Sequence, residues 1–198
     1  FFKNGYPTCG YLGRGLKISD ETGVAWGEIL RQVPDSRLIL KGDEYRQPYF
    51  RKRIMDILVA QGVDERRVTL MVGTCRFDHL STYNLIDIML DPWPVGSGVT
   101  ALDAVFMGVP IVSKLGDLVP SRVASSVISQ VGLQDWQNTD MRQYIATALA
   151  WANDIPFLDD CRKTFRSKME ASAIMDGETV ARAWEKQLRQ IWRDYCST

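Results

Sequence analysis

The chain has 198 residues, of which 45% are hydrophobic and 24% are charged, and its 24 basic and 24 acidic residues give a formal net charge of zero. This composition is that of a globular protein with a substantial core, and the balanced charge excludes a broad attraction to nucleic acid or to an anionic membrane. No apolar run approaches the roughly 20 residues that a membrane-spanning helix needs.

The four cysteines indicate a reducing compartment rather than a cysteine-based site. Cys9, Cys75, Cys161 and Cys196 lie far apart and form no CxxC pair. This spacing argues against a zinc ribbon or a redox motif and favours a cytoplasmic location. We also expect no metal site, because no cluster of carboxylates, histidines or cysteines has metal-ligand spacing.

Strands and helices alternate over the first part of the chain. Residues 1–17, rich in glycine and aromatics, predict a strand and a loop. Apolar or β-branched runs predict further strands, and apolar residues at helical spacing predict helices. The expected strands are residues 37–41, 67–72, 86–90 and 110–113, and the expected helices are residues 19–33, 45–61, 78–85 and 100–107. This alternation implies an α/β fold with a parallel sheet covered on both faces, whose ligands lie beyond the carboxyl ends of the strands. The loops 73–79 and 91–100, which both follow strands, are therefore the candidate ligand-binding loops.

From about Pro120 onward the pattern is helical. The expected helices are residues 121–131, 139–153, 157–173 and 177–195. The last is strongly amphipathic, and its apolar side carries Val180, Trp184, Leu188, Ile191, Trp192 and Tyr195. Because this is more helix than a small sheet needs for cover, we expect two parts. Residues 1–135 form a Rossmann-like domain, and residues 136–198 form helices that pack on it and on a partner domain.

The stretch from Leu90 to Pro110, LDPWPVGSGVTALDAVFMGVP, is the most informative part of the chain. An apolar strand ends in Asp91, a turn follows, and a helix starts at once. The turn consists of Gly96, Ser97, Gly98, Val99 and Thr100. Such a turn presents backbone N–H groups and a positive helix end to an anion, here the diphosphate of a nucleotide sugar. Because it is neither a Walker A motif nor GxGxxG, a tight turn with Thr100 as a helix cap is the alternative.

Asp103 is expected on the first turn of the helix that follows. A carboxylate at this position can accept hydrogen bonds from ribose hydroxyls. The alternative is compensation of the helix macrodipole, which is worth about 0.3–1 kcal/mol.

Three further side chains are candidates for the same site. His79 is the only histidine, and without a nucleophile motif it argues against a Ser-His-Asp hydrolase. Its alternative is a structural polar residue or a cap. Arg76 can reach the same ligand, and its alternative is a solvated charge. Lys17, just before the first helix, can neutralise a leaving diphosphate, and its alternative is a surface lysine.

Together these segments resemble the C-terminal half of the catalytic region of the O-linked N-acetylglucosamine transferase family, which includes the SPINDLY-like proteins. The resemblance runs over nearly the whole chain. It is strongest in residues 17–36, the loop ending in His79, residues 90–110 and residues 121–126. It implies the C-terminal half of a GT-B fold, which holds a UDP-sugar and needs no metal or other cofactor. The chain is therefore expected to be a fragment that lacks the N-terminal catalytic half and the tetratricopeptide repeats.

The resemblance also implies residue roles. Lys17 matches the lysine that contacts the diphosphate and assists its departure, and His79 matches a histidine at the donor site. Arg76 falls where the family has a lysine near the uracil. Thr100 matches a threonine of the phosphate turn, and Asp103 the carboxylate that holds the ribose. Arg14, Thr74, Gly96, Ser97, Gly98 and Val99 are also expected to line the UDP-sugar site.

The implied function is metal-independent transfer, with inversion, of a sugar from UDP-N-acetylglucosamine or UDP-glucose to a Ser/Thr hydroxyl or an Asn amide of a protein. Two alternatives remain. Where the family turn reads Gly-His-Thr-Thr-Gly, this chain has Gly98 in place of the histidine and Val99 in place of the first threonine. A non-catalytic interaction module with a decayed donor site is therefore the second hypothesis, and a nucleotide-sugar epimerase with the same fold is the third.

Overall fold

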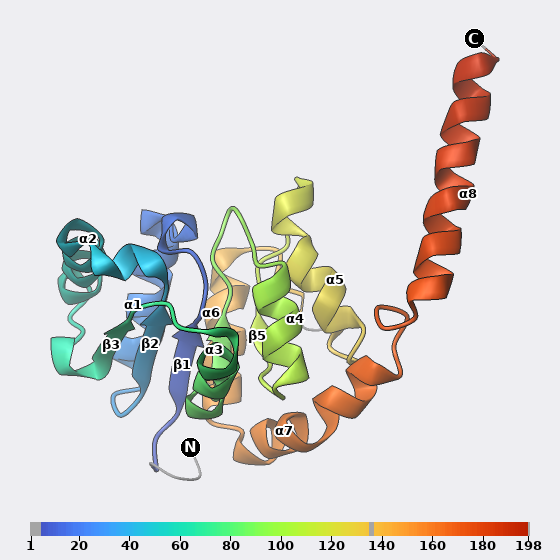
Figure 1. The fold of residues 1–198 in the computed structure, drawn as a ribbon. Helices are drawn as coiled ribbons and strands as arrows, with labels where there is room; N and C mark the ends of the chain where they lie inside the picture. Colours follow the sequence, from blue (N-terminus) through green and yellow to red (C-terminus); the bar gives the residue numbers. More distant parts are fainter. Residues whose placement is uncertain (1–4, 135–136, 198) are drawn as a thin grey trace.

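The centre of the computed structural model, which describes residues 5–134 and 137–197, is a five-stranded sheet (Figure 1). The strands are β1 (Thr8–Tyr11), β2 (Arg37–Lys41), β3 (Val68–Met71), β4 (Ile88–Leu90) and β5 (Ile111–Val112). All neighbouring pairs are parallel, in the order β3-β2-β1-β4-β5. The predicted parallel α/β fold is confirmed.

Helices cover both faces of this sheet. The α-helices of the described chain are α1 (Asp20–Gln32), α2 (Pro48–Ala60), α3 (Arg76–Thr82), α4 (Val99–Phe106), α5 (Val123–Ser129), α6 (Met141–Ala152), α7 (Ile155–Glu170) and α8 (Gly177–Cys196), of which α8 does not cover the sheet. The short 3-10 helices are η1 (Gly15–Lys17), η2 (Asp43–Arg46), η3 (Glu65–Arg67), η4 (Tyr83–Leu85) and η5 (Val119–Ser121). Helix α1 packs against α2 and α6, whereas α4 packs against α5 and α7. The two groups are what right-handed crossovers on either side of β1 produce.

Local signals set most of the helix ends. The side chain of Ser19 accepts a hydrogen bond from the Thr22 amide at 3.1 Å and thereby caps α1. Pro48 occupies the first turn of α2, where its missing N–H costs nothing. Gly62 and Gly108, with φ of 81° and 75°, follow α2 and α4 in the left-handed conformation that ends a helix.

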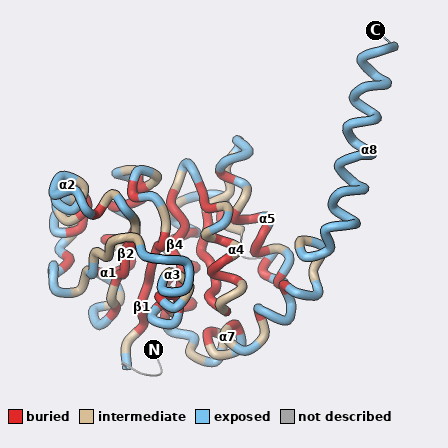
Figure 2. The backbone as a smooth tube through the Cα atoms, viewed as in Figure 1, coloured by how far each residue is buried: buried red, intermediate tan, exposed pale blue. Residues whose placement is uncertain are grey.

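The core lies between the sheet and its helices, and the central strands β1 and β4 are buried along their whole length (Figure 2). Trp26 of α1 and Tyr144 of α6 are both buried, and the indole N–H of Trp26 donates to the Tyr144 hydroxyl at 2.9 Å. That hydroxyl donates in turn to the carbonyl of Asp91 at 3.0 Å, directly after β4. Helix α6 is thus linked to the carboxyl end of the sheet.

Several boundaries differ by up to about three residues from those predicted, and two of these differences lie beside the candidate site. The helix expected over residues 78–85 begins two residues earlier, at Arg76, and its last turn is the separate 3-10 helix η4. The strand expected from residue 86 begins at Ile88. Arg76, Asp78 and His79 therefore share one short helix, which fixes their relative directions.

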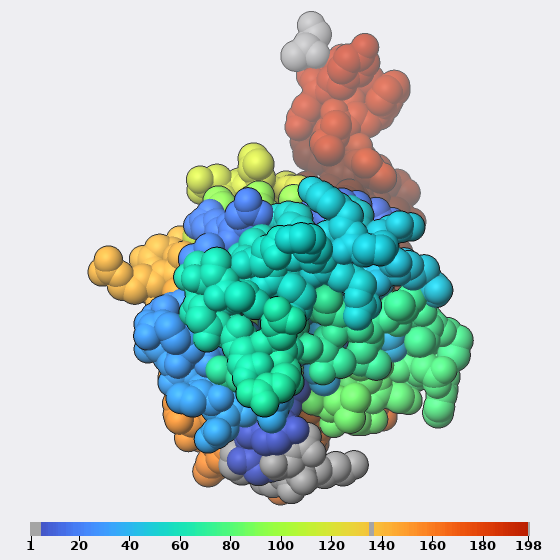
Figure 3. Space-filling model, turned by 90° about the vertical axis from the view of Figure 1, so that its left-hand side faces the viewer, coloured from blue at the N-terminus to red at the C-terminus, as the bar shows by residue number. Residues whose placement is uncertain are grey.

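The C-terminal helices behave in two ways. Helices α6 and α7 contribute buried side chains to the core, but α8 has no buried residue and extends away from the rest of the chain (Figure 1). The space-filling view from the α2 side shows the same projection (Figure 3). Helices α6 and α7 thus pack on the folded body, and α8 does not. The boundary expected between residues 135 and 136 lies outside the described residues. In the described part of the chain, no helix combines the length and apolar character needed to cross a membrane.

Candidate functional site

The candidate site lies where the strand order reverses. β1 and β4 are neighbours in the sheet, but the chain leaves β1 toward β2 on one side and leaves β4 toward β5 on the other. In open parallel sheets, the loops after two such strands diverge, and ligands bind in the crevice between them. The loop after β1 carries Arg14 and Lys17, and the loop after β4 carries the glycine turn of residues 96–100.

Lys17 joins these two loops. Its ammonium donates a hydrogen bond to the carbonyl of Gly96 at 2.7 Å, and the side chain is neither fully buried nor free at the surface. Lys17 therefore lies beside the glycine turn. The ammonium keeps donors for a second acceptor in the crevice, since a lysine has three.

The glycine turn leads directly into α4. Gly98 is the N-cap, and no side chain caps the helix, so the alternative that placed Thr100 as the cap is wrong. Among the described residues, none accepts a hydrogen bond from the backbone N–H groups of Val99 and Thr100. These groups and the positive end of the helix form an arrangement suited to an anion.

The buried carboxylate of Asp91 supports the glycine turn through hydrogen bonds. Its carboxylate accepts hydrogen bonds from the Ser97 amide at 2.8 Å and from the Ser113 hydroxyl at 2.9 Å. A Cβ on Gly96 would lie 2.8 Å from the same carboxylate, so only glycine fits there. Burial raises the pKa of Asp91 to about 6, although these hydrogen bonds and the nearby Lys17 oppose the rise.

A second cluster joins α3 to α4. The guanidinium of Arg76 forms a bidentate pair with the carboxylate of Asp103, with Nη1–Oδ2 and Nη2–Oδ1 distances of 2.6 and 2.5 Å. His79 Nε2 lies 3.9 Å from Asp103 Oδ2. Because α4 begins at Val99, Asp103 lies on the second turn rather than the first, and it pairs with a side chain rather than serving as a free charge at the helix start. The side chain of Arg76 is 62% exposed, so the arginine is both solvated, as the alternative held, and paired with Asp103.

The surroundings of His79 favour a neutral imidazole. Burial lowers its pKa, and the cations Lys41 and Arg76 act in the same direction, while Asp103 acts in the opposite direction. The imidazole also meets the ring of Tyr83 edge-on, with ring centroids 5.7 Å apart. A neutral, partly buried imidazole can stack on a flat ligand or exchange a hydrogen bond with it.

A cavity of about 420 Å³ opens beside this cluster, at the carboxyl ends of β1, β2 and β3. Its lining includes Arg14, Thr74 and His79, three of the residues that the sequence assigned to the donor site. Lys41 and Gly73 lie in the same wall. The predicted residues thus form neighbouring groups along one edge of the sheet: the turn with Lys17, the pair of Arg76 with Asp103, and this cavity.

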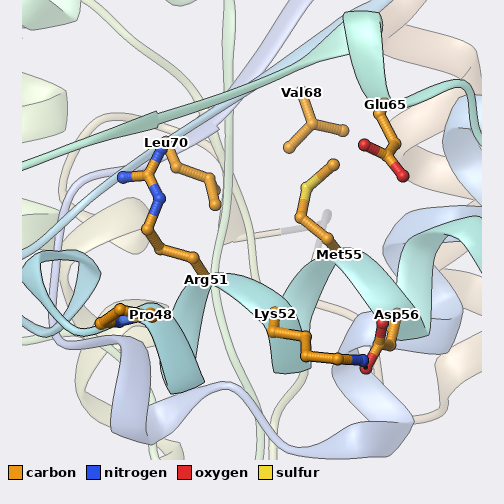
Figure 4. A pocket seen from close by; sticks show the side chains of 8 residues that line it. All are labelled: Pro48, Arg51, Lys52, Met55, Asp56, Glu65, Val68 and Leu70. Carbon is orange, nitrogen blue, oxygen red and sulfur yellow. Dashed lines mark hydrogen bonds and ion pairs between the residues drawn. The ribbon is translucent and has the colours of Figure 1, made fainter.

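A larger cavity of about 590 Å³ lies elsewhere, between α2 and the edge strand β3 (Figure 4). Its floor is formed by Met55, Val68 and Leu70, and Arg51 and Lys52 stand at its rim. It contains none of the predicted site residues and lies away from the crevice between β1 and β4. In the described ranges, no group of three or more His, Cys, Asp or Glu side chains is placed to hold a metal ion.

The sequence did not single out two side chains that shape this edge, Asp91 and Lys41. Both end a buried parallel strand with a charge, Asp91 just after β4 and Lys41 at the end of β2. This position could have identified both residues from the sequence, because a charge at the carboxyl end of a buried parallel strand lies at the edge of the sheet where ligands bind.

The chain was compared with known proteins. The model of "Glycosyl transferase family 41" matches residues 9–183. A barley (Hordeum vulgare) protein named "Probable UDP-N-acetylglucosamine--peptide N-acetylglucosaminyltransferase SPINDLY" is 32% identical over 98% of this chain, which covers 21% of that protein. The chain thus spans about a fifth of the length of such relatives.

The solved structures agree with this. A mutant of the Thermobaculum terrenum O-GlcNAc transferase superposes with a TM-score of 0.90 at 32% identity, over 98% of this chain and 37% of that one. A sucrose-phosphate synthase from Thermosynechococcus elongatus superposes with a TM-score of 0.64 at 18% identity, over 96% of this chain and 46% of that one. The second likeness shows the fold alone.

Proposed function

Because this chain belongs to glycosyl transferase family 41, we propose that it forms the donor-binding half of a protein glycosyltransferase. The proposed donor is UDP-N-acetylglucosamine or UDP-glucose. The names of the barley and Thermobaculum relatives, which specify N-acetylglucosamine transfer, support this donor class. The single observation that carries the proposal is the placement of Lys17 against the glycine turn at the start of α4.

The diphosphate is proposed to bind at that turn. The backbone N–H groups of Val99 and Thr100 point out of the first turn of α4, and Lys17 adds a positive charge beside them. In the reaction, the acceptor atom bonds to the sugar C1 as the bond from C1 to the diphosphate oxygen breaks. Negative charge then grows on the leaving diphosphate, where donors fixed in advance stabilise it. No step in this proposal uses a metal.

The nucleoside is proposed to lie toward α3. Asp103 would accept hydrogen bonds from the ribose hydroxyls, and Arg76 and His79 would contact the base. Arg14 and Thr74 line the adjoining cavity of about 420 Å³, whose position suits the nucleoside end of such a donor. Since Arg76 occupies both Asp103 oxygens in the structure, donor binding has to loosen or share that pair.

The acceptor is proposed to be a Ser/Thr hydroxyl or an Asn amide of a protein, reached with inversion at C1. The base that removes the acceptor proton is proposed to come from the N-terminal half of the catalytic region, which is also the proposed partner of α8. The four free cysteines are consistent with a cytoplasmic setting, which we propose as well.

The test is a thermal-shift titration with UDP, with GDP as the comparison, followed by calorimetry on wild type and Lys17→Ala. A selective, saturable rise in melting temperature with UDP is expected, because a ligand of the folded state stabilises it. Lys17→Ala should weaken UDP binding at least about tenfold, since it removes a charge-assisted contact to the diphosphate. Equal affinity for UDP and GDP would refute the donor assignment.

One observation favours a second candidate, an interaction module without catalysis. Helix α8 exposes Trp184, Leu188 and Trp192, with exposed fractions of 58–65%, and buries none of its residues. If the turn with Gly98 and Val99 no longer binds donor, that face is the remaining functional surface. No thermal shift at millimolar UDP, together with self-association of the chain, would favour this candidate.

A further inference from the structure

Lys41 is a buried ammonium at the edge of the candidate nucleoside cavity. The residue is 2% exposed and ends strand β2, which lies between β3 and β1. Its Nζ donates hydrogen bonds to Thr74 Oγ1 and Thr82 Oγ1, both at 2.8 Å, and to the carbonyl of Asp78 at 3.3 Å. All three donors of the ammonium are therefore used within the protein.

The three acceptors are uncharged. No ion pair among residues 5–134 and 137–197 includes Lys41. Burying a cation without a carboxylate partner costs free energy, and burial accordingly lowers the pKa of Lys41, with Asp78 opposing the change. A methionine of similar length would fill the space without that cost, so stability alone does not account for a lysine here.

The contacts of Lys41 join three elements around the cavity. Thr74 lies in the loop after β3 and lines the cavity, whereas Asp78 and Thr82 belong to α3. The Thr82 hydroxyl also donates to the Asp78 carbonyl at 2.7 Å, so Lys41 and Thr82 together fix that turn of α3. His79 follows Asp78 directly and lines the same cavity. The position of the imidazole therefore depends on the turn that Lys41 holds.

The charge of Lys41 also reaches His79. The charged groups around the imidazole are Lys41 from β2, Arg76 from its own helix and Asp103 from α4. Arg76 and Asp103 form a bidentate pair, so their effects on the imidazole partly cancel. Lys41 forms no direct ion pair within residues 5–134 and 137–197, and only the more distant Asp78 carboxylate offsets its charge.

We infer that Lys41 is a positioning residue of the nucleotide site: it holds Thr74 and His79 at the cavity wall for contact with the nucleobase, and its charge adds to the burial that favours a neutral imidazole there. The inference rests on the proposed function, since it assumes that a nucleotide occupies this cavity. It assigns different residues to the two ends of the donor. Lys41 supports binding of the base, and Lys17 with the glycine turn binds the diphosphate.

The first readout does not require a nucleotide. His79 is the only histidine of the chain, so its imidazole protons give a resolved NMR titration. Lys41→Met should raise the pKa of His79 by about 0.5 unit or more, because a nearby cation is removed. The matched control is Lys163→Met, which changes an exposed lysine of α7 and should leave the titration unchanged. An unchanged His79 pKa in folded Lys41→Met overturns the inference.

The second readout separates the base from the diphosphate. Lys41→Met is expected to weaken binding of the nucleotide that the wild type prefers, UDP or GDP, about tenfold, with inorganic diphosphate binding unchanged. Equal loss for nucleotide and diphosphate, or no loss for either, overturns the inference. If the wild type binds neither nucleotide, the proposed function fails, and the His79 titration still decides whether Lys41 controls the imidazole.

A second variant covers the case in which Lys41→Met does not fold. Thr82→Val keeps the shape of a buried side chain outside the cavity lining but removes one acceptor of Lys41. It should weaken nucleotide binding about threefold and spare diphosphate binding. Thr164→Val, at a half-buried position of α7 away from the cavity lining, is the matched control and should change neither. Unaltered nucleotide binding in Thr82→Val would count against the inference.

Discussion

Asp91 shows how one side chain both builds the candidate site and weakens the fold. Its carboxylate, in a residue only 2% exposed, holds the Ser97 amide and the Ser113 hydroxyl. Burial disfavours the charged form of the Asp91 carboxyl group. The folded chain therefore binds a proton at this carboxyl group more tightly than the unfolded chain does. Holding the turn with an ionised Asp91 therefore lowers the unfolding free energy by an amount that depends on pH.

Asp91→Asn should remove that dependence. With a folded pKa of about 6, above that of an ordinary carboxyl group, the wild type loses stability as pH rises from about 4 to about 6 and does not regain it above. The asparagine can still accept from the Ser97 amide. Relative to wild type, the variant should gain about 2 kcal/mol in unfolding free energy between pH 4.5 and pH 7.5, measured by urea unfolding. A difference between the two proteins that is the same at both pH values would contradict this.

Gly108 gives a second prediction at the scale of a residue. Its φ is 75°, and a Cβ there would lie 2.9 Å from both the Cα and the carbonyl oxygen of Arg162. Gly62 has a similar φ of 81° but open space around it. We expect Gly108→Ala to lower the unfolding free energy by at least about 3 kcal/mol and Gly62→Ala by about 1 kcal/mol, because only the first adds a clash to the strain. Equal losses in thermal unfolding would show that the contact with Arg162 relaxes freely.

At the scale of elements, similar caps serve helices with different surroundings. Asp140 caps α6 by accepting from the Gln143 amide at 2.8 Å, and Asp176 caps α8 by accepting from the Thr179 amide at 3.0 Å. Helix α6 packs on α1 and on two strands, but α8 buries nothing. The same chemical change should therefore have different consequences for the whole protein.

Asp140→Ala should lower the global unfolding free energy by about 1 kcal/mol, the usual worth of a cap in a helix that unfolds with the core. Asp176→Ala should leave global unfolding unchanged and reduce the helical circular dichroism signal, because only α8 frays. Chemical denaturation and far-ultraviolet circular dichroism of the two variants measure these effects. A matching loss of global stability in Asp176→Ala would mean that α8 unfolds together with the core.

The difference between local signals and contacts between distant residues explains what the sequence could predict. Spacing and caps are local, so the alternation of strands and helices follows from them, and most helix bounds follow to within about three residues. Helix α3 is one of several whose N-cap residue makes no capping hydrogen bond, so its start gave no signal. The pairing of Arg76 with Asp103 and of Lys41 with Thr74 joins residues 27 and 33 positions apart. No local pattern encodes such contacts. The resemblance suggested that Asp103 binds the ribose, but it did not suggest that Arg76 pairs with the Asp103 carboxylate.

At the scale of the whole molecule, α8 is separate from the folded body in both views (Figures 1 and 3). Its neighbour α7, in contrast, buries Leu158, Cys161 and Phe165 in the core. The stability of the chain is thus distributed over the sheet and the helices up to α7.

Removing residues 177–198 should shift the melting temperature by less than about 2 °C, because no side chain of α8 is buried. The shortened chain should also self-associate less, since the exposed apolar face is gone. Scanning calorimetry and sedimentation measure the two effects. Removing residues 155–198 is the comparison, and the loss of α7 should destabilise the chain severely. A large fall in melting temperature for the first truncation would show that α8 supports the fold.

The hydrogen-bonded series from Trp26 through Tyr144 to the Asp91 carbonyl has a consequence for folding order. Its two bonds join residues 118 and 53 positions apart, so they close long loops. During synthesis, the strands and the glycine turn emerge well before Tyr144 does. A nascent chain that ends before α6 holds every residue of the candidate site but lacks the support beneath it. The capacity to bind ligand should therefore arise late and in a single step, when α6 docks against the completed sheet.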